Sequence, residues 1–325
     1  MEATPPAIDV HAHTVTPAYR AGLAAAGISR PDGFPHIPEW SFDDARALMD
    51  SVGIEIAILS VSSPGIHFGD DAEARALARA VNEEMASGVA DAPGRFGFVA
   101  ALPLPDVDGA LEEIRHAFED LHADGVGLLT NAQGAYVGDP RFEEVMAELD
   151  RRAAVVVLHP TSPPGWESVA LGYPRPMIEF PFDTTRSVVN LVLTRTVERH
   201  ARIRFIVPHS GSALPVLADR AAELSALLSL TGDEPVDVVA SLQSLYYDLT
   251  GPTLPRALPA LLGLVGPERL LYGSDYPFPP PSFVQRMMDD LMRSDVLGEA
   301  DRARMLRGNA LDLFPRFRTA GTSSS

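Results

Sequence analysis

Two histidines stand two positions apart at the end of the first apolar run, Ile8-Asp9-Val10-His11-Ala12-His13. In a β-strand, alternate side chains point to the same face, so the imidazoles of His11 and His13 would lie side by side. Two neighbouring imidazoles form half of a tetrahedral metal site. If the pair binds a metal, the remaining ligands must come from the ends of other strands.

Three further apolar runs are each followed by a side chain that could complete this site, namely His159, His209 and Asp275. A single histidine at a strand end is often a hydrogen-bonded core residue, and an aspartate after Gly-Ser is often a turn or a helix cap. Because all of these side chains follow predicted strands, their joint placement favours one shared site.

The elements that would position these side chains alternate along the chain. The predicted strands are residues 7–11, 54–60, 96–101, 126–129, 154–159, 203–209, 244–249 and 269–273. The predicted helices are residues 42–51, 72–90, 109–123, 140–152, 185–199, 214–228, 254–264 and 283–297. Such alternation indicates parallel strands joined by helical crossovers. Eight repeats in about 300 residues predict an α/β fold of the (β/α)8 TIM barrel type, with a doubly wound open sheet as the alternative.

In such a barrel the functional site lies at the carboxyl ends of the strands. Asp9 shares the parity of the histidine pair, so it would either orient a ligand imidazole from one layer deeper or cap the lower end of the barrel. The fourth strand ends without a lysine or glutamate that could bridge a second metal, which makes one metal the expected count. Insertion loops at residues 27–40 and 173–183 are expected at the carboxyl-terminal rim.

Composition limits the function classes further. The chain has 325 residues, of which 46% are hydrophobic and 22% charged, as in globular proteins. We expect one domain over residues 1–318 and a disordered tail over residues 319–325. With no membrane-length apolar run, no signal-peptide pattern and no cysteine, a cytoplasmic location is the default expectation. A net charge of −18 without a basic stripe argues against a nucleic-acid partner, and no membrane partner is expected.

All 26 basic residues are arginines. This composition excludes Schiff-base chemistry on a lysine and a lysine-carbamate bridge between two metals. A metal site in this chain must therefore use histidines, carboxylates and water.

Together these motifs resemble the amidohydrolase superfamily, and specifically its decarboxylase branch. The resemblance rests on the His-x-His opening, His159-Pro160, His209-Ser210-Gly211 and Gly273-Ser274-Asp275-Tyr276-Pro277-Phe278, and it extends over about residues 8–314. The branch includes aminocarboxymuconate semialdehyde decarboxylase, γ-resorcylate decarboxylase and 6-methylsalicylate decarboxylase. Shorter phrases at residues 37–41, 59–65 and 68–71 are most similar to the 6-methylsalicylate decarboxylases.

The resemblance implies roles for particular residues. One divalent metal, expected to be Zn²⁺ with Mn²⁺ as the alternative, would be bound without any organic cofactor. Its ligands would be His11, His13, His159 and Asp275. The resemblance also implies that His209 positions or activates water or substrate at the metal. Arg220 would reach into the partner subunit of a homodimer and bind a carboxylate, or would simply be an exposed helix residue.

The implied activity is non-oxidative decarboxylation of a small aromatic, salicylate-type acid, with 6-methylsalicylate as one candidate substrate. Asp275, assisted by His209, would deliver a proton to the ring carbon. The candidate walls for the substrate ring are Trp166, Tyr173, Phe182 and Phe278, with Arg186 near the rim. Plain packing is the favoured interpretation of these aromatic residues, except for Phe278, where the two interpretations are balanced. The alternative activity is hydrolysis of a lactone or cyclic amide, and a non-catalytic binding barrel is a third interpretation.

Overall fold

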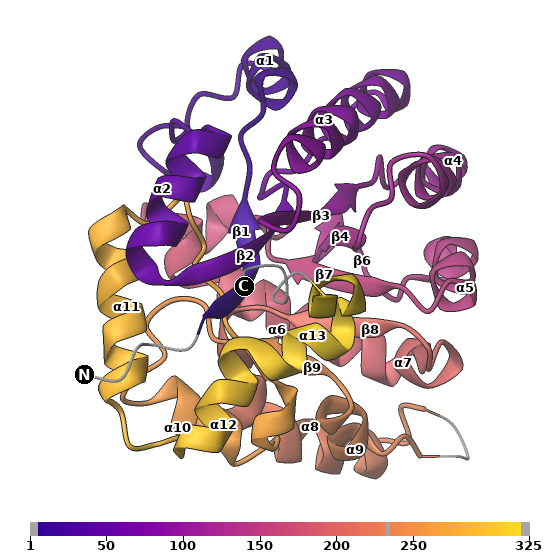
Figure 1. Ribbon diagram of the computed structural model, residues 1–325. Coiled ribbons are helices and arrows are strands. Elements are labelled where there is room, and N and C mark those ends of the chain that lie inside the picture. Colours follow the sequence, from indigo (N-terminus) through magenta and orange to yellow (C-terminus); the bar gives the residue numbers. More distant parts are fainter. Residues whose placement is uncertain (1–5, 232–234, 320–325) are drawn as a thin grey trace.

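The computed structural model describes residues 6–231 and 235–319. Its main sheet has eight parallel strands (Figure 1). In spatial order they are β1 (Ala7–His13), β2 (Ile54–Ser60), β3 (Phe96–Ala101), β4 (Gly125–Leu129), β7 (Val155–His159), β8 (Arg204–Val207), β9 (Tyr246–Asp248) and β10 (Leu270–Leu271). A parallel bridge between Asp9 and Tyr272 joins the last strand to the first. The predicted (β/α)8 barrel is therefore confirmed, and the open sheet is wrong.

Helices surround the strands (Figure 1). They are α1 (Pro17–Ala25), α2 (Phe42–Val52), α3 (Asp71–Asp91), α4 (Val107–Glu119), α5 (Glu143–Arg151), α6 (Glu179–Leu193), α7 (Thr196–Arg199), α8 (Leu214–Leu227), α9 (Val238–Gln243), α10 (Ala257–Leu262), α11 (Pro281–Arg293), α12 (Glu299–Ala303) and α13 (Asn309–Leu313). Several begin at a side chain that accepts a hydrogen bond from the first turn, as Ser41, Asp70 and Asp106 do. Such caps satisfy backbone N–H groups that the helix itself leaves unpaired.

Two sequence predictions need correction in the second half of the barrel. The insertion predicted at residues 173–183 ends early because α6 already begins at Glu179. The helix predicted over residues 185–199 is broken at Arg195, whose backbone has the left-handed φ of 58°. A small antiparallel hairpin, β5 (Asn131–Ala132) and β6 (Ala135–Tyr136), follows β4. None of the helices in the described part of the chain is long and apolar enough to cross a membrane.

The amino-terminal end of the barrel is closed by the last described segment of the chain. Inward-facing aliphatic side chains of the strands form one buried cluster with this segment. The cluster comprises Ile8, Val10, Ile56, Ile58, Val99, Val155, Val157, Ile206, Leu271, Ala310, Leu313, Phe314 and Phe317. In Figure 1, α13 lies across the strands at this end. Thr319, the first residue of the predicted tail, ends a short 3-10 helix, and residues 320–325 lie outside the described residues.

Replacing Phe317 by alanine should destabilise the barrel without touching its upper rim. The Phe317 side chain is 1% exposed, so its loss leaves a cavity beneath the barrel. We expect the free energy of unfolding to fall by about 3–5 kcal/mol, measured by urea denaturation. The control is Phe283→Ala on α11, whose ring is only partly buried, and for which we expect a clearly smaller loss of about 1 kcal/mol. Equal losses in the two variants would contradict a packed closure at this end.

Candidate metal centre

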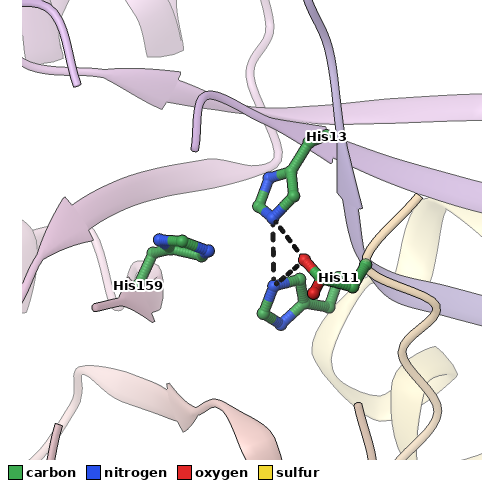
Figure 2. A group of neighbouring side chains, drawn as sticks. His11, His13 and His159 are labelled. Carbon is green, nitrogen blue, oxygen red and sulfur yellow. Dashed lines mark hydrogen bonds and ion pairs between the residues drawn. The ribbon is translucent and has the colours of Figure 1, made fainter. Parts of the chain in front are cut away.

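The structure brings four of the predicted side chains together at the carboxyl-terminal mouth of the barrel. Their possible ligand atoms all lie within 4.8 Å of one another, and the residues are His11, His13, His159 and Asp275. The two Nε2 atoms of His11 and His13 are 3.1 Å apart. Asp275 Oδ1 lies 3.1 Å from His13 Nε2 and 3.5 Å from His11 Nε2. Figure 2 shows the His159 ring turned toward the gap beside the other two rings.

Hydrogen bonds fix which nitrogen of each ring faces the centre. His11 Nδ1 lies 2.8 Å from Asp248 Oδ2, and His159 Nδ1 lies 2.7 Å from its neighbour's carbonyl oxygen. Both oxygens can only accept, so each Nδ1 carries a hydrogen. His13 Nδ1 lies 2.9 Å from Ser60 Oγ, which itself donates to a backbone carbonyl and so accepts from the ring. The Nε2 atoms of the three rings therefore converge, and each offers a lone pair once its ring is neutral, which for His11 requires loss of a proton.

The charges of the cluster also fit a divalent cation. Burial lowers the pKa of His13, and it lowers the pKa of His159 well below the usual value. Burial lowers the pKa of His11 too, but Asp248 and Asp275 more than compensate and raise it to about 10. Although burial opposes it, hydrogen bonds from His11 and its neighbours hold the pKa of Asp275 well below its usual value. Three buried imidazoles facing a partly buried carboxylate are a donor set that binds Zn²⁺ and similar metals.

His209 lies beside this cluster but outside it. Its Nε2 is 3.9 Å from Asp275 Oδ2, which is too long for a hydrogen bond. The backbone of His209 has a φ of 56° and that of Asp275 a φ of 63°, both in the left-handed region. Such conformations cost about 1–3 kcal/mol each and persist where surrounding contacts impose them. Here the His209 N–H donates to Asp248 Oδ1 at 2.9 Å, and the Asp275 N–H donates to the His11 carbonyl at 2.8 Å.

Sequence reasoning missed the two side chains that hold the ligand rings. Ser60 ends β2 and Asp248 ends β9, so both occupy the strand-end position that identified the predicted ligands. Asp9 takes neither of its two predicted roles. Its Oδ1 accepts the backbone N–H of His11 at 3.0 Å and of Ser274 at 3.1 Å, and burial raises its pKa to about 6. It therefore ties the end of β1 to the segment after β10.

A cavity of about 520 Å³ lies beside His159. Its walls combine apolar and polar side chains. The apolar ones include Val61, Ile66, Phe68, Leu129 and Trp166, and the polar ones include Ser60, His67, Asn131, Gln133, Thr161 and Ser162. Ala26 and Ile28 also line it, which places the start of the predicted 27–40 loop at the mouth. A space of this size accommodates a monocyclic aromatic acid.

The other residues predicted to contact the substrate do not line this cavity. Phe278 does not line the cavity, but its ring packs edge-on against His13 with centroids 5.6 Å apart. Tyr173 and Phe182 do not line this cavity, and each is more than half exposed, so their predicted contact with a substrate ring stays a prediction. Arg186 lies 3.3 Å from Asp183 rather than in the cavity. Arg220 is exposed on α8.

Replacing Asp248 by asparagine should weaken metal binding while the barrel stays folded. The variant loses the carboxylate that fixes the tautomer of His11, and such partners change metal affinity about 10- to 100-fold. Zn²⁺ affinity is measured by competition with a chelator, and folding by circular dichroism. Asp295→Asn, which changes an exposed carboxylate, is the control. Unchanged affinity in the Asp248 variant would show that this hydrogen bond does not support a metal site.

The geometry can now be compared with known proteins. The family described as Amidohydrolase matches residues 8–316. The 6-methylsalicylic acid decarboxylase acuB of Aspergillus aculeatus is 36% identical, over 96% of this chain and 97% of its own length. A crystal structure of an amidohydrolase II has a TM-score of 0.89 at 34% identity, covering 95% of this chain and 99% of its own. A 2,6-dihydroxybenzoate decarboxylase complexed with 2,6-dihydroxybenzoate has a TM-score of 0.82 at 25% identity, covering 96% and 100%. The chain belongs to the amidohydrolase family, in the branch whose named members are decarboxylases.

Proposed function

We propose that this protein is a metal-dependent, non-oxidative decarboxylase of a small aromatic acid of the salicylate type, and that it releases CO2 and a phenol. The observation that carries the proposal is the cluster of three histidines and one aspartate beside a cavity of about 520 Å³. The named activities of the family relatives support the same reaction. We take 6-methylsalicylate as the leading candidate substrate, because a relative with that name is 36% identical over almost the whole chain.

One divalent metal would be held by His11, His13, His159 and Asp275, without an organic cofactor. We favour Zn²⁺ because three of the four donors are imidazole nitrogens, with Mn²⁺ as the alternative. When bound, the metal would act as a Lewis acid and template for the substrate's carboxylate and neighbouring phenol oxygen.

The residues of the chain address the main difficulty of the reaction, which is that direct loss of CO2 would leave an aryl carbanion. Protonation of the ring carbon before C–C cleavage avoids this carbanion, and loss of CO2 then restores the aromatic ring. We assign the proton delivery to Asp275, whose side chain is 27% exposed while those of His11 and His13 are fully buried. Because its pKa is held low, Asp275 must receive that proton from the substrate phenol or from water. His209, 3.9 Å from Asp275 Oδ2, is placed to assist.

Decarboxylation is tested directly with purified, metal-analysed protein. After loading with Zn²⁺ or Mn²⁺, it is incubated with 6-methylsalicylate, 2,6-dihydroxybenzoate and salicylate, and separately with lactones. We expect equal amounts of CO2 and of the corresponding phenol, with 3-methylphenol formed from 6-methylsalicylate. Lactone opening without release of CO2 would instead support the hydrolase alternative.

The matched variant in this assay is Asp275→Asn. It keeps the shape of the side chain but cannot transfer a carboxyl proton, so we expect turnover to fall by at least about 100-fold. Metal content is measured in the same preparation, since three histidine ligands remain. Near-normal turnover with metal retained would contradict the role assigned to Asp275.

We also propose a homodimer. Large apolar side chains are exposed on α8 and on the segment before α6, including Val216 at 73%, Leu227 at 76% and Leu171 at 81%. Such a face is unusual on a monomer. On α8, residues 216, 220, 224 and 227 share one side of the helix, which would place Arg220 within the interface. We expect no nucleic-acid or membrane partner, and a cytoplasmic location remains the expectation from the sequence.

A charge introduced into this apolar face should separate the subunits. The variant is Val216→Glu combined with Leu227→Glu, because two buried carboxylates would be costly in an apolar interface. We expect the mass in solution to fall from that of a dimer to about 35 kDa, measured by light scattering after gel filtration. Ala300→Glu, an exposed position on α12, is the control. A wild-type protein that is already monomeric would contradict the proposal.

A further inference from the structure

We propose that Arg175 is a substrate-positioning residue, which acts with Ser162 and Asp32 to hold Trp166 in place as the outer wall of the cavity. The inference rests on the proposed function, since it treats the cavity as the site of an aromatic acid. It concerns two loops at the rim, the segment after β7 and the segment after β1.

The guanidinium of Arg175 lies over the indole ring of Trp166. Its guanidinium carbon is 3.9 Å from the centroid of the ring, within the range of a cation–π contact. Trp166 lines the cavity, whereas Arg175 does not. The guanidinium therefore contacts the indole from outside the cavity that Trp166 lines. The chain around Trp166 offers little other support, because the flanking residues 164–165 and 167–169 are exposed.

A relay of hydrogen bonds connects this stack to the loop after β1. Arg175 Nε donates to Ser162 Oγ at 3.0 Å, and Ser162 Oγ donates to Asp32 Oδ1. A serine hydroxyl has one hydrogen, so the bond to Asp32 leaves its lone pairs to accept from Arg175. Asp32 is itself buried, with a left-handed φ of 51°. Ser162 thus holds both ends of the relay and also lines the cavity.

Glycine at position 33 allows the two loops to approach closely. A Cβ added there would lie 2.9 Å from Arg175 Nη1, and the backbone has a φ of +85°. Any larger residue would therefore push the guanidinium away from its place over the indole.

The charges around Arg175 suit a positioning role beside an anionic substrate. Within the described residues, no carboxylate oxygen forms an ion pair with Arg175. Its guanidinium is linked to the Asp32 carboxylate by hydrogen bonds through the Ser162 hydroxyl. The cavity lining contains no arginine, and its one carboxylate belongs to Glu167. A guanidinium over the indole offsets some of the electron density of that ring, which favours contact with an electron-rich phenol.

The first test separates binding from chemistry. The variants are Arg175→Lys, which keeps the charge but loses the planar stack and the Nε donor, and Ser162→Ala, which removes the relay hydroxyl. For 6-methylsalicylate we expect KM to rise about tenfold in each, with kcat within about twofold of wild type, because Asp275 and the metal ligands are unaffected. Ser162→Thr keeps the hydroxyl, so its KM should stay close to the wild-type value. The matched control is Arg286→Lys, whose guanidinium stacks on Phe283 at 4.7 Å on α11. Unchanged KM in both Arg175→Lys and Ser162→Ala would overturn the inference.

The second test does not depend on turnover. The chain has two tryptophans, so a Trp40→Phe background leaves Trp166 as the only one. We expect acrylamide quenching of Trp166 fluorescence to increase at least about twofold when Arg175→Lys or Ser162→Ala is added, and to stay unchanged with Arg286→Lys. If wild type decarboxylates no aromatic acid but the quenching increases, the proposed function fails and the relay stands. Unchanged quenching would overturn the relay even in an active enzyme.

Discussion

The site depends on the seam where the first strand of the barrel meets the last. His13 and Asp275 are 262 residues apart in the chain, yet their side chains are in contact. The Asp275 N–H donates to the His11 carbonyl, and the His13 N–H donates to the Tyr276 carbonyl at 2.7 Å. Asp9 reinforces the seam from within by accepting backbone N–H groups on both sides. Burying a carboxylate is unfavourable unless it is hydrogen-bonded. The two backbone N–H groups that Asp9 accepts at the seam offset the desolvation of its side chain.

The four clustered side chains could be predicted because their signal is local and the rule that unites them is general. A histidine at the end of an apolar strand is visible in the sequence, and a (β/α)8 barrel gathers all such ends at one mouth. Ser60 and Asp248 obey the same rule but escaped notice, because serine and aspartate commonly occur at strand ends as turn or capping residues. What distinguishes them is the ring nitrogen that each one contacts, and this contact depends on the neighbouring strand.

The rim could not be predicted in the same detail, because nothing periodic marks its residues. Trp166 and Tyr173 are both aromatic residues in a segment rich in proline and glycine, yet only Trp166 lines the cavity. Long-range contacts decide between them, through Arg175 and the loop after β1. The start of α6 was missed for another reason. Pro181 favoured a loop, but proline is tolerated in the first turn of a helix, where its missing N–H costs nothing.

The two ends of the barrel divide stability from chemistry. The lower end is closed by apolar contacts of Phe314 and Phe317 with the strand interiors. The upper end carries strained backbone at His209 and Asp275 together with buried histidines and carboxylates, all of which oppose folding. The polar and strained residues of the upper end add little to the stability of the fold. The well-packed lower end stabilises the barrel enough to retain them. The same division explains why the seam, which joins both ends, is held by backbone hydrogen bonds rather than by apolar packing alone.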